Sequence, residues 1–335
     1  MKRPPRRTRP SRGVEAVTTL TTVAPEVPTP PPPPDVRRHR PGHGRRQLAA
    51  AVTGWGFIGP AMVVVLGLSV FPAVWAFFLS REHWNGFSDP VGVGWDNYRT
   101  MAQDPDLAAA VKHTMLFTGL FVPTSIVGGM LLAVALNQPV RFAAFYRTCV
   151  FVPFVASAAA TGILFGFVFN PQFGAANNLL RVLHIPQQGF LESQNQAMLV
   201  IAVMALWQQL GFTVVVYLAA LQDIPRDLIE AARTDGANSW QVFRHITLPQ
   251  LAPVTVFTTV WQTITALQLF DLVFTTTRGG PLGATQTVVY YLWEQAFRKL
   301  DFGYGSAVAY GLFAVTMLLT LVMVVYSKRT KFEAF

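Results

Sequence analysis

The sequence predicts an all-α, polytopic membrane protein with six transmembrane helices. Its 335 residues are 52% hydrophobic and only 13% charged, whereas soluble domains carry about 25% charged residues. Long windows contain no charged residue, and each exceeds the ~20 residues that a helix needs to cross a bilayer. Eleven of the 26 Lys and Arg precede the first window, within the first 46 residues. The net charge of +9 therefore belongs mainly to one end of the chain, and we expect no nucleic-acid partner.

Residues 1–46 differ in composition from the rest of the chain. They open with MKRPPRRTRP and contain a proline run at 30–34, followed by five arginines. Such a segment cannot bury an apolar core, so we predict a disordered, basic and proline-rich cytoplasmic tail. It could contact anionic lipid or serve as a proline-motif ligand, but a solvated topology signal is the simpler interpretation. Residues 47–335 form the transmembrane domain.

The charge-free windows give the expected membrane spans. The charged residues of the chain lie in the segments between these windows and at the two ends. The single cysteine, Cys149, excludes an intrachain disulfide and a multi-cysteine metal site, and its apolar surroundings predict a buried thiol. The expected spans are 47–80, 113–140, 148–180, 193–222, 245–270 and 302–327.

The distribution of basic residues predicts the orientation in the membrane. With the N-terminus inside, 19 Lys and Arg lie on the inner side and 7 on the outer side. The positive-inside rule therefore places both termini in the cytoplasm of a multi-pass protein of the cell membrane. The polar stretch at residues 223–253 lies on the same side.

That stretch contains the start and stop signals of two short helices joined by a turn. Pro225 suits the first position of a helix, where its missing N–H is not needed. Gly236 can take the left-handed conformation that ends a helix. Ser239 is then expected to cap the second helix, and Pro249 to close the unit, because the residue before a proline leaves the helical region.

The residues Glu230-Ala231-Ala232, Asp235-Gly236-Ala237 and Ile246-Thr247-Leu248-Pro249 resemble the EAA loop of importer-type ABC transporter permeases. The alternative is an ordinary amphipathic hairpin. The resemblance implies that residues 223–253 dock against a cytoplasmic ATPase subunit, and that 47–335 are a permease domain with the type I ABC importer fold. It assigns contacts with the ATPase to one set of residues: Glu230, Ala231, Arg233, Asp235, Gly236, Trp240 and Phe243. A simple alternative for Glu230 is pairing with Arg226 or Arg233 within its helix.

Three further stretches sharpen the resemblance. Residues 94–98, GWDNY, and 147–153, RTCVFVP, are similar to segments that precede the second and third spans of the family. Phe270-Asp271, with Gly279-Gly280-Pro281 and Thr285, resembles the signature of the first of the two permease subunits in carbohydrate importers of the maltose and glycerol-3-phosphate type. Thr234 departs from the pattern, which has a bulky apolar residue there.

Polar side chains inside the spans are the candidates for a substrate pathway. Sugars are bound by amides and carboxylates together with flat aromatic faces, and both kinds of residue are neighbours in two spans. Each amide could instead join helices to one another, while an ionisable group such as Asp271 near the end of a span is expected to be functional. The candidates are Gln208, Gln209, Trp261, Gln262, Gln268, Phe270 and Asp271.

The chain lacks the phosphate loop, HExxH and GxSxG motifs, so we expect no enzyme activity and no cofactor or metal on it. The resemblance implies a second permease subunit, two ATP-binding subunits that hold ATP and Mg²⁺, an extracytoplasmic solute-binding protein and the lipid bilayer as partners.

A carbohydrate is the expected substrate. A polyamine or phosphate importer is the main alternative. A secondary transporter should show charged residues inside its spans, and a membrane enzyme should show a paired His, Asp or Glu set there.

Overall fold

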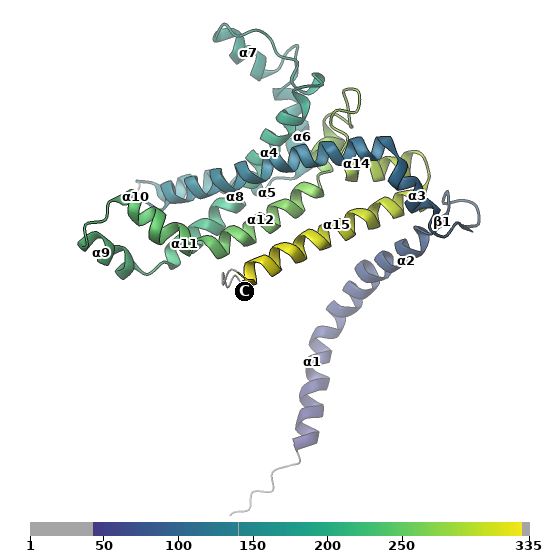
Figure 1. The fold of residues 1–335 in the computed structure, drawn as a ribbon, viewed down its shortest axis with the longest axis horizontal. Helices are drawn as coiled ribbons and strands as arrows, with labels where there is room; N and C mark the ends of the chain where they lie inside the picture. The colour runs from purple at the N-terminus through teal and green to yellow at the C-terminus, as the bar shows by residue number, and fades with distance from the viewer. Residues whose placement is uncertain (1–42, 140, 330–335) are drawn as a thin grey trace, which may run out of the picture. The chain divides into compact units, whose positions relative to one another are not determined.

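The computed structural model describes residues 43–139 and 141–329, with side chains for 53–139 and 141–325. The predicted tail lies outside this part of the chain except at its end, because helix α1 begins at His43, four residues before the expected boundary. The chain divides into two units, one up to Met62 and one from Val63. Nearly all regular structure in the described part is helical, which confirms the predicted all-α class (Figure 1).

The elements follow one another along the chain with few long connections. Two short strands form an antiparallel pair, in which Glu82 lies opposite Gly92 and His83 lies opposite Val91. The elements are α1 His43–Val65, a π-helical turn Leu66–Val70, α2 Phe71–Leu79, β1 Glu82–His83, β2 Val91–Gly92, α3 Asp96–Gln103, α4 Pro105–Leu136, α5 Ala143–Val155, α6 Ala158–Val168, α7 Ala175–Val182, a 3₁₀ turn Phe190–Glu192, α8 Ala197–Asp223, α9 Arg226–Thr234, α10 Ser239–Val242, a π-helical turn Phe243–Thr247, α11 Leu248–Gln250, α12 Ala252–Leu267, α13 Asp271–Thr275, α14 Val288–Trp293, a π-helical turn Glu294–Arg298 and α15 Phe302–Arg329.

Five helical stretches in the described residues are long and apolar enough to cross a membrane: 53–79, 105–136, 197–223, 252–275 and 302–325. The remaining expected span, the third along the chain at 148–180, is different. The helical pair there is α5 and α6, which begins five residues earlier, ends at Val168 and is bent by 101°. The charge-free window could not show this break, since neither side of it contains a charged residue within 148–180.

Helices α4, α8 and α12 form the centre of the second unit (Figure 1). Phe117 and Phe121 of α4 stack with ring centroids 5.3 Å apart, and both are almost fully buried. α4 and α8 approach closely at Gly129, because a Cβ there would overlap the side chain of Thr213. Small residues at such a contact allow membrane helices to pack backbone to backbone.

A buried polar chain joins the same three helices. The hydroxyls of Ser125 in α4 and Thr213 in α8 lie 3.1 Å apart, and the Gln262 amide of α12 donates to the Thr213 hydroxyl at 2.7 Å. All three side chains are buried, so these bonds hold the helices in one register.

The polar stretch between α8 and α12 forms the expected helix–turn–helix, with three corrections. Pro225 is the N-cap residue of α9, which begins at Arg226, rather than the first residue of the helix. Gly236 has φ +86°, as predicted for the turn. The second helix is capped by Asn238 rather than Ser239, because Asn238 and Gln241 form a reciprocal capping box. Pro249 does not close the unit. A π-helical turn over Phe243–Thr247 shifts the hydrogen bonds, and the helix runs through Pro249 to Gln250.

At the N-terminal end of α4, hydrogen bonds link this helix to its neighbours. Asp104 caps α4 through the backbone amides of Asp106 and Leu107, and its carboxylate also accepts the hydroxyls of Tyr291 and Tyr304. Burial opposes ionisation, but the tyrosine and backbone hydrogen bonds outweigh it and lower the pKa of Asp104. The carboxylate therefore ties α4 to α14 and α15.

Candidate substrate cavity and coupling hairpin

A small cavity of about 100 Å³ lies between α4, α6, α8 and the junction of α12 with α13. Phe117 and Phe121 form its apolar side. Five of the seven predicted pathway residues line it: Gln208, Gln209, Gln268, Phe270 and Asp271. Two of these residues come from α8 and three from the α12–α13 junction, segments far apart in sequence that the tertiary fold brings together.

Gln209 supplies the cavity with an unused acceptor. Its Oε1 atom is buried and has no hydrogen-bond partner among the described residues. An unpaired buried amide oxygen is costly unless a ligand or water donates to it. This oxygen is therefore a candidate acceptor for a substrate hydroxyl.

The neighbouring Gln208 has a structural partner. It is 7% exposed, and its Nε2 donates to the Ala156 carbonyl oxygen at 3.0 Å. Ala156 has an extended conformation, with φ −69° and ψ 143°, at the break between α5 and α6. A break leaves backbone carbonyls without helical donors, and in a membrane a side chain must satisfy them. Gln208 thus supports the bend while also lining the cavity.

The other predicted polar groups at this site lie at the α12–α13 junction. Gln268 and Asp271 are exposed, and Phe270 packs on the rings of Phe274, Tyr290 and Trp293. Within the described part of the chain, the Asp271 carboxylate has neither a hydrogen bond nor an ion pair. Its helix, α13, is capped by Phe270 without a side-chain bond. Asp271 is thus available to a ligand.

Two predicted pathway residues do not line this cavity. Gln262 is fully buried in the chain formed with Ser125 and Thr213, which is the interhelical role that the sequence left open as an alternative. Trp261 is 45% exposed and packs against Phe212, with ring centroids 5.2 Å apart. Both lie about one helical turn before Thr265, the α12 residue that lines the cavity, so their position along the helix keeps them out of its lining.

The sequence did not identify several lining residues. Thr265 and Ala158 also contribute, together with Phe117, Phe121 and Ala205. Thr265 of α12 lies three residues before the predicted Gln268, and this spacing could have suggested it. Ala158 could not be found, since its position depends on the 101° bend.

The predicted coupling residues lie on the exposed hairpin formed by α9 and α10. Glu230 and Asp235 are exposed, and Glu230 makes no ion pair with Arg226 or Arg233 among the described residues. A Cβ on Gly236 would meet no atom within 4 Å, so only its positive φ requires glycine. Trp240 is 65% exposed and stacks on Phe243 with centroids 5.7 Å apart.

A groove of about 420 Å³ separates this hairpin from the ends of α4 and α8. Arg233, Trp240 and Phe243 line it from the hairpin. Ala231, the remaining predicted contact, is exposed on α9. Exposed aromatic and charged side chains around a groove are typical of a protein-binding surface.

Residues 125–331 match the family described as binding-protein-dependent transport system inner membrane component. The chain belongs to this family. It is 34% identical over 286 residues to the lactose transport system permease protein LacF of Rhizobium radiobacter, covering 84% of this chain and 95% of that protein. It is also 34% identical over 266 residues to the sn-glycerol-3-phosphate transport system permease protein UgpA of Agrobacterium fabrum, covering 78% and 90%.

The fold of the permease agrees with a solved bacterial ABC transporter involved in the import of the acidic polysaccharide alginate. The TM-score is 0.77 at 21% identity, covering 87% of this chain and all of that chain. This likeness confirms the type I ABC importer permease fold. The permease is a multi-pass membrane protein, as predicted from its apolar windows.

Several family-like motifs in the permease have structural roles. Asn97 of the GWDNY segment is buried and donates to the carbonyl oxygens of Ser80 and Glu82 at 3.0 and 2.9 Å. Thr285 is fully buried and donates to the Gly280 carbonyl oxygen at 2.7 Å. Arg147 donates to the Leu136 carbonyl oxygen at the end of α4. Cys149 is exposed, which corrects the prediction of a buried thiol.

In the part of the chain that the structure describes, no three His, Cys, Asp or Glu residues are grouped closely enough to hold a metal ion.

The two neighbouring glutamines should differ in their effect on stability. Gln208→Leu removes the donor to the Ala156 carbonyl oxygen and should destabilise the fold by about 1–3 kcal/mol. Gln209→Leu removes an unpartnered buried oxygen and should leave stability unchanged or raise it. Thermal unfolding of the two purified variants in detergent tests this, and an equal loss in both would contradict the assigned roles.

Proposed function

We propose that this permease forms half of the translocation pathway of an ATP-driven importer for an uncharged carbohydrate. One observation carries the proposal. The exposed α9–α10 hairpin is the direct connection between α8 and α12, whose residues form the walls of the cavity. Fourteen residues of continuous helix, or about 21 Å, separate Gln209 from the end of α8 at Asp223. Movement of the hairpin therefore displaces cavity walls.

The hairpin fits an ATP-binding subunit as its partner. Glu230, Asp235 and Gly236 are exposed there, as is Trp240, which stacks on the half-buried Phe243. ATP and Mg²⁺ would bind the partner, because this chain has no phosphate loop. Closure of two ATPase subunits would move two such hairpins together and open the pathway by alternating access.

A second permease subunit would complete the pathway. The cavity of about 100 Å³ is smaller than the ~300–1,000 Å³ of typical ligand sites. Apolar surface is available for such a partner, since α2 has no buried residue and exposes Phe71, Trp75 and Phe78. An extracytoplasmic solute-binding protein would deliver the substrate to the opposite end from the hairpin.

The hairpin and both termini are assigned to the cytoplasm on the distribution of basic residues. In a Cys149→Ser background, cysteines at Ser239 and Gly283 should react with a membrane-impermeant maleimide from opposite sides. Gly283→Cys should be labelled in intact cells, and Ser239→Cys only after the membrane is opened. Labelling of both from outside would contradict this orientation.

The chemistry of the cavity favours a neutral sugar. It presents amides, an aromatic ring and the Asp271 carboxylate, and neither lysine nor arginine is among its described lining residues. Relatives named for lactose and for multiple sugars have substrates of this kind. Other relatives are named for sn-glycerol-3-phosphate and sulfoquinovosyl glycerol, which makes an anionic substrate the second candidate. A phosphate or sulfonate would find no cation in this cavity.

Gly236→Val should uncouple the transporter while the complex still assembles. A β-branched residue resists φ +86°, so the turn between α9 and α10 should distort. Uptake and substrate-stimulated ATPase activity should fall by at least an order of magnitude. Gly94→Val is the matched control, because Gly94 has φ +63°, equally open space and a position far from the hairpin in sequence. Wild-type uptake by Gly236→Val would refute the coupling role.

The reconstituted transporter should respond to uncharged sugars. Together with its binding protein, it should increase ATP hydrolysis with at least one of lactose, maltose, sucrose or trehalose. It should not respond to sn-glycerol-3-phosphate or to spermidine. Gln209→Leu should reduce sugar uptake about tenfold, the effect of one lost hydrogen bond to substrate. Gln103→Leu, at the exposed end of α3, is the control. Stimulation by the phosphate or the polyamine alone would overturn the carbohydrate assignment.

A further inference from the structure

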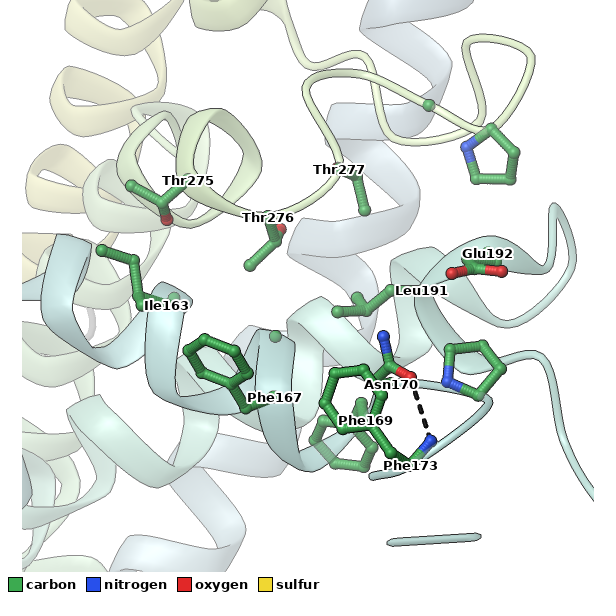
Figure 2. A pocket seen from close by; sticks show the side chains of 15 residues that line it. Ile163, Phe167, Phe169, Asn170, Phe173, Leu191, Glu192, Thr275, Thr276 and Thr277 are labelled. Atoms are coloured by element: carbon green, nitrogen blue, oxygen red, sulfur yellow. Dashed lines mark hydrogen bonds between the residues drawn. The ribbon is translucent and has the colours of Figure 1, made fainter. Parts of the chain in front are cut away.

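A second and larger cavity lies beside the one that contains Gln209. Its volume is about 540 Å³, within the range of typical ligand sites. α6 and the turn after it form one side, and the end of α13 with Gly280-Pro281 forms the other (Figure 2). Leu191 and Glu192 close a third side. We refer to it as the outer cavity, following the orientation proposed above.

The outer cavity follows directly on the first. Ala158 and Asp271 line the first cavity, while Gly162 and Thr275, each one helical turn further along, line the outer one. α6 and α13 touch between the two cavities, because a Cβ on Gly162 would overlap the Thr275 hydroxyl. A ligand in the outer cavity would therefore lie next to the proposed pathway, separated from it by one helix contact.

Asn170 presents a fixed hydrogen-bond donor to the outer cavity. Its Oδ1 accepts the backbone amides of Gln172 and Phe173 at 2.9 and 3.1 Å. This Asx turn orients the amide so that its nitrogen points into the cavity (Figure 2). Within the described residues, that nitrogen has no acceptor.

Glu192 supplies an acceptor across the same space. Its carboxylate has neither a hydrogen bond nor an ion pair within the described part of the chain, and it lies beside Leu191 on the cavity rim (Figure 2). The described lining contains no lysine, arginine or histidine. An anionic ligand would be repelled, whereas a hydroxyl would find both a donor and an acceptor.

Aromatic rings form the apolar side. Phe167 and Phe173 are each 62% exposed, so their rings are available to a ligand. The opposite side is rigid, because the hydroxyls of Thr277 and Thr285 lie 2.7 Å apart and Thr285 also bonds to Gly280. Flat aromatic faces with a few fixed polar groups are suited to a sugar ring.

We propose that the outer cavity is a binding site for an uncharged mono- or disaccharide, held by Asn170 and Glu192 against Phe167 before it passes the Gly162–Thr275 contact. The site deepens the proposed function and rests on it, since it assigns a further sugar-binding position to the same pathway. It selects against phosphate and sulfonate groups through Glu192.

Protection of an introduced cysteine tests the site. Gly166 lines the outer cavity, and a Cβ there would meet no atom within 4 Å, so Gly166→Cys should be tolerated. The native Cys149 is replaced by serine. The purified full transporter, without binding protein, is treated with a neutral methanethiosulfonate reagent in the presence of lactose, maltose, sucrose, trehalose or sn-glycerol-3-phosphate. Leu179→Cys, which is exposed on α7 outside the cavity, is the matched control.

The sugar that is transported should slow modification of Gly166→Cys about tenfold at a concentration that fills nine-tenths of the sites. It should not protect Leu179→Cys, and sn-glycerol-3-phosphate should protect neither. Adding Glu192→Gln should raise the sugar concentration needed for half-protection about tenfold, since a charged acceptor is lost.

Four outcomes would overturn the site: no protection by a sugar that is transported, equal protection of both cysteines, equal protection by the phosphate, or no reaction of Gly166→Cys at all. Each of these leaves uptake of the sugar intact, so the importer assignment would stand. Failure of every sugar to be transported is a separate result that rejects the proposed function.

Discussion

The hydrogen bond from Gln208 to the Ala156 carbonyl oxygen is the interaction on which the arrangement of both cavities depends. Inside a membrane, a helix cannot break unless another group satisfies the freed backbone. Gln208 meets that requirement at the point where α5 ends and α6 departs at 101°. Because α6 departs there, Ala158 reaches the first cavity and Gly162 reaches α13.

Close backbone contacts fix this bend against α8. A Cβ on Gly211 would collide with the backbone of Val150 and Phe151 in α5, so glycine permits the approach. On the other side of α8, Thr213 bonds to α4 and α12. The helix that joins the cavity to the coupling hairpin is thus held on two faces, which suits a rigid lever better than a flexible linker.

Some polar side chains of the permease have hydrogen-bond partners inside the protein, and others lack them. The first kind supports the fold, and the second kind marks the candidate binding sites. Asn97 and Thr285 have their hydrogen bonds inside the protein and hold turns together. Gln209 Oε1 and the carboxylates of Asp271 and Glu192 lack such partners in the described residues. Unsatisfied groups that face a cavity are the ones that a substrate can use.

The sequence by itself determined the helical class, the apolar windows and the helix–glycine–helix hairpin. These follow from local properties: the absence of charge over a span, the left-handed conformation of Gly236 and the pattern around Glu230. Only the tertiary structure decided which amides serve the scaffold and which face a cavity, because that depends on partners distant in sequence. Gln208 and Gln209 are adjacent and chemically identical. They differ because the helical rotation between them turns one toward Ala156 and leaves the other's oxygen without a donor.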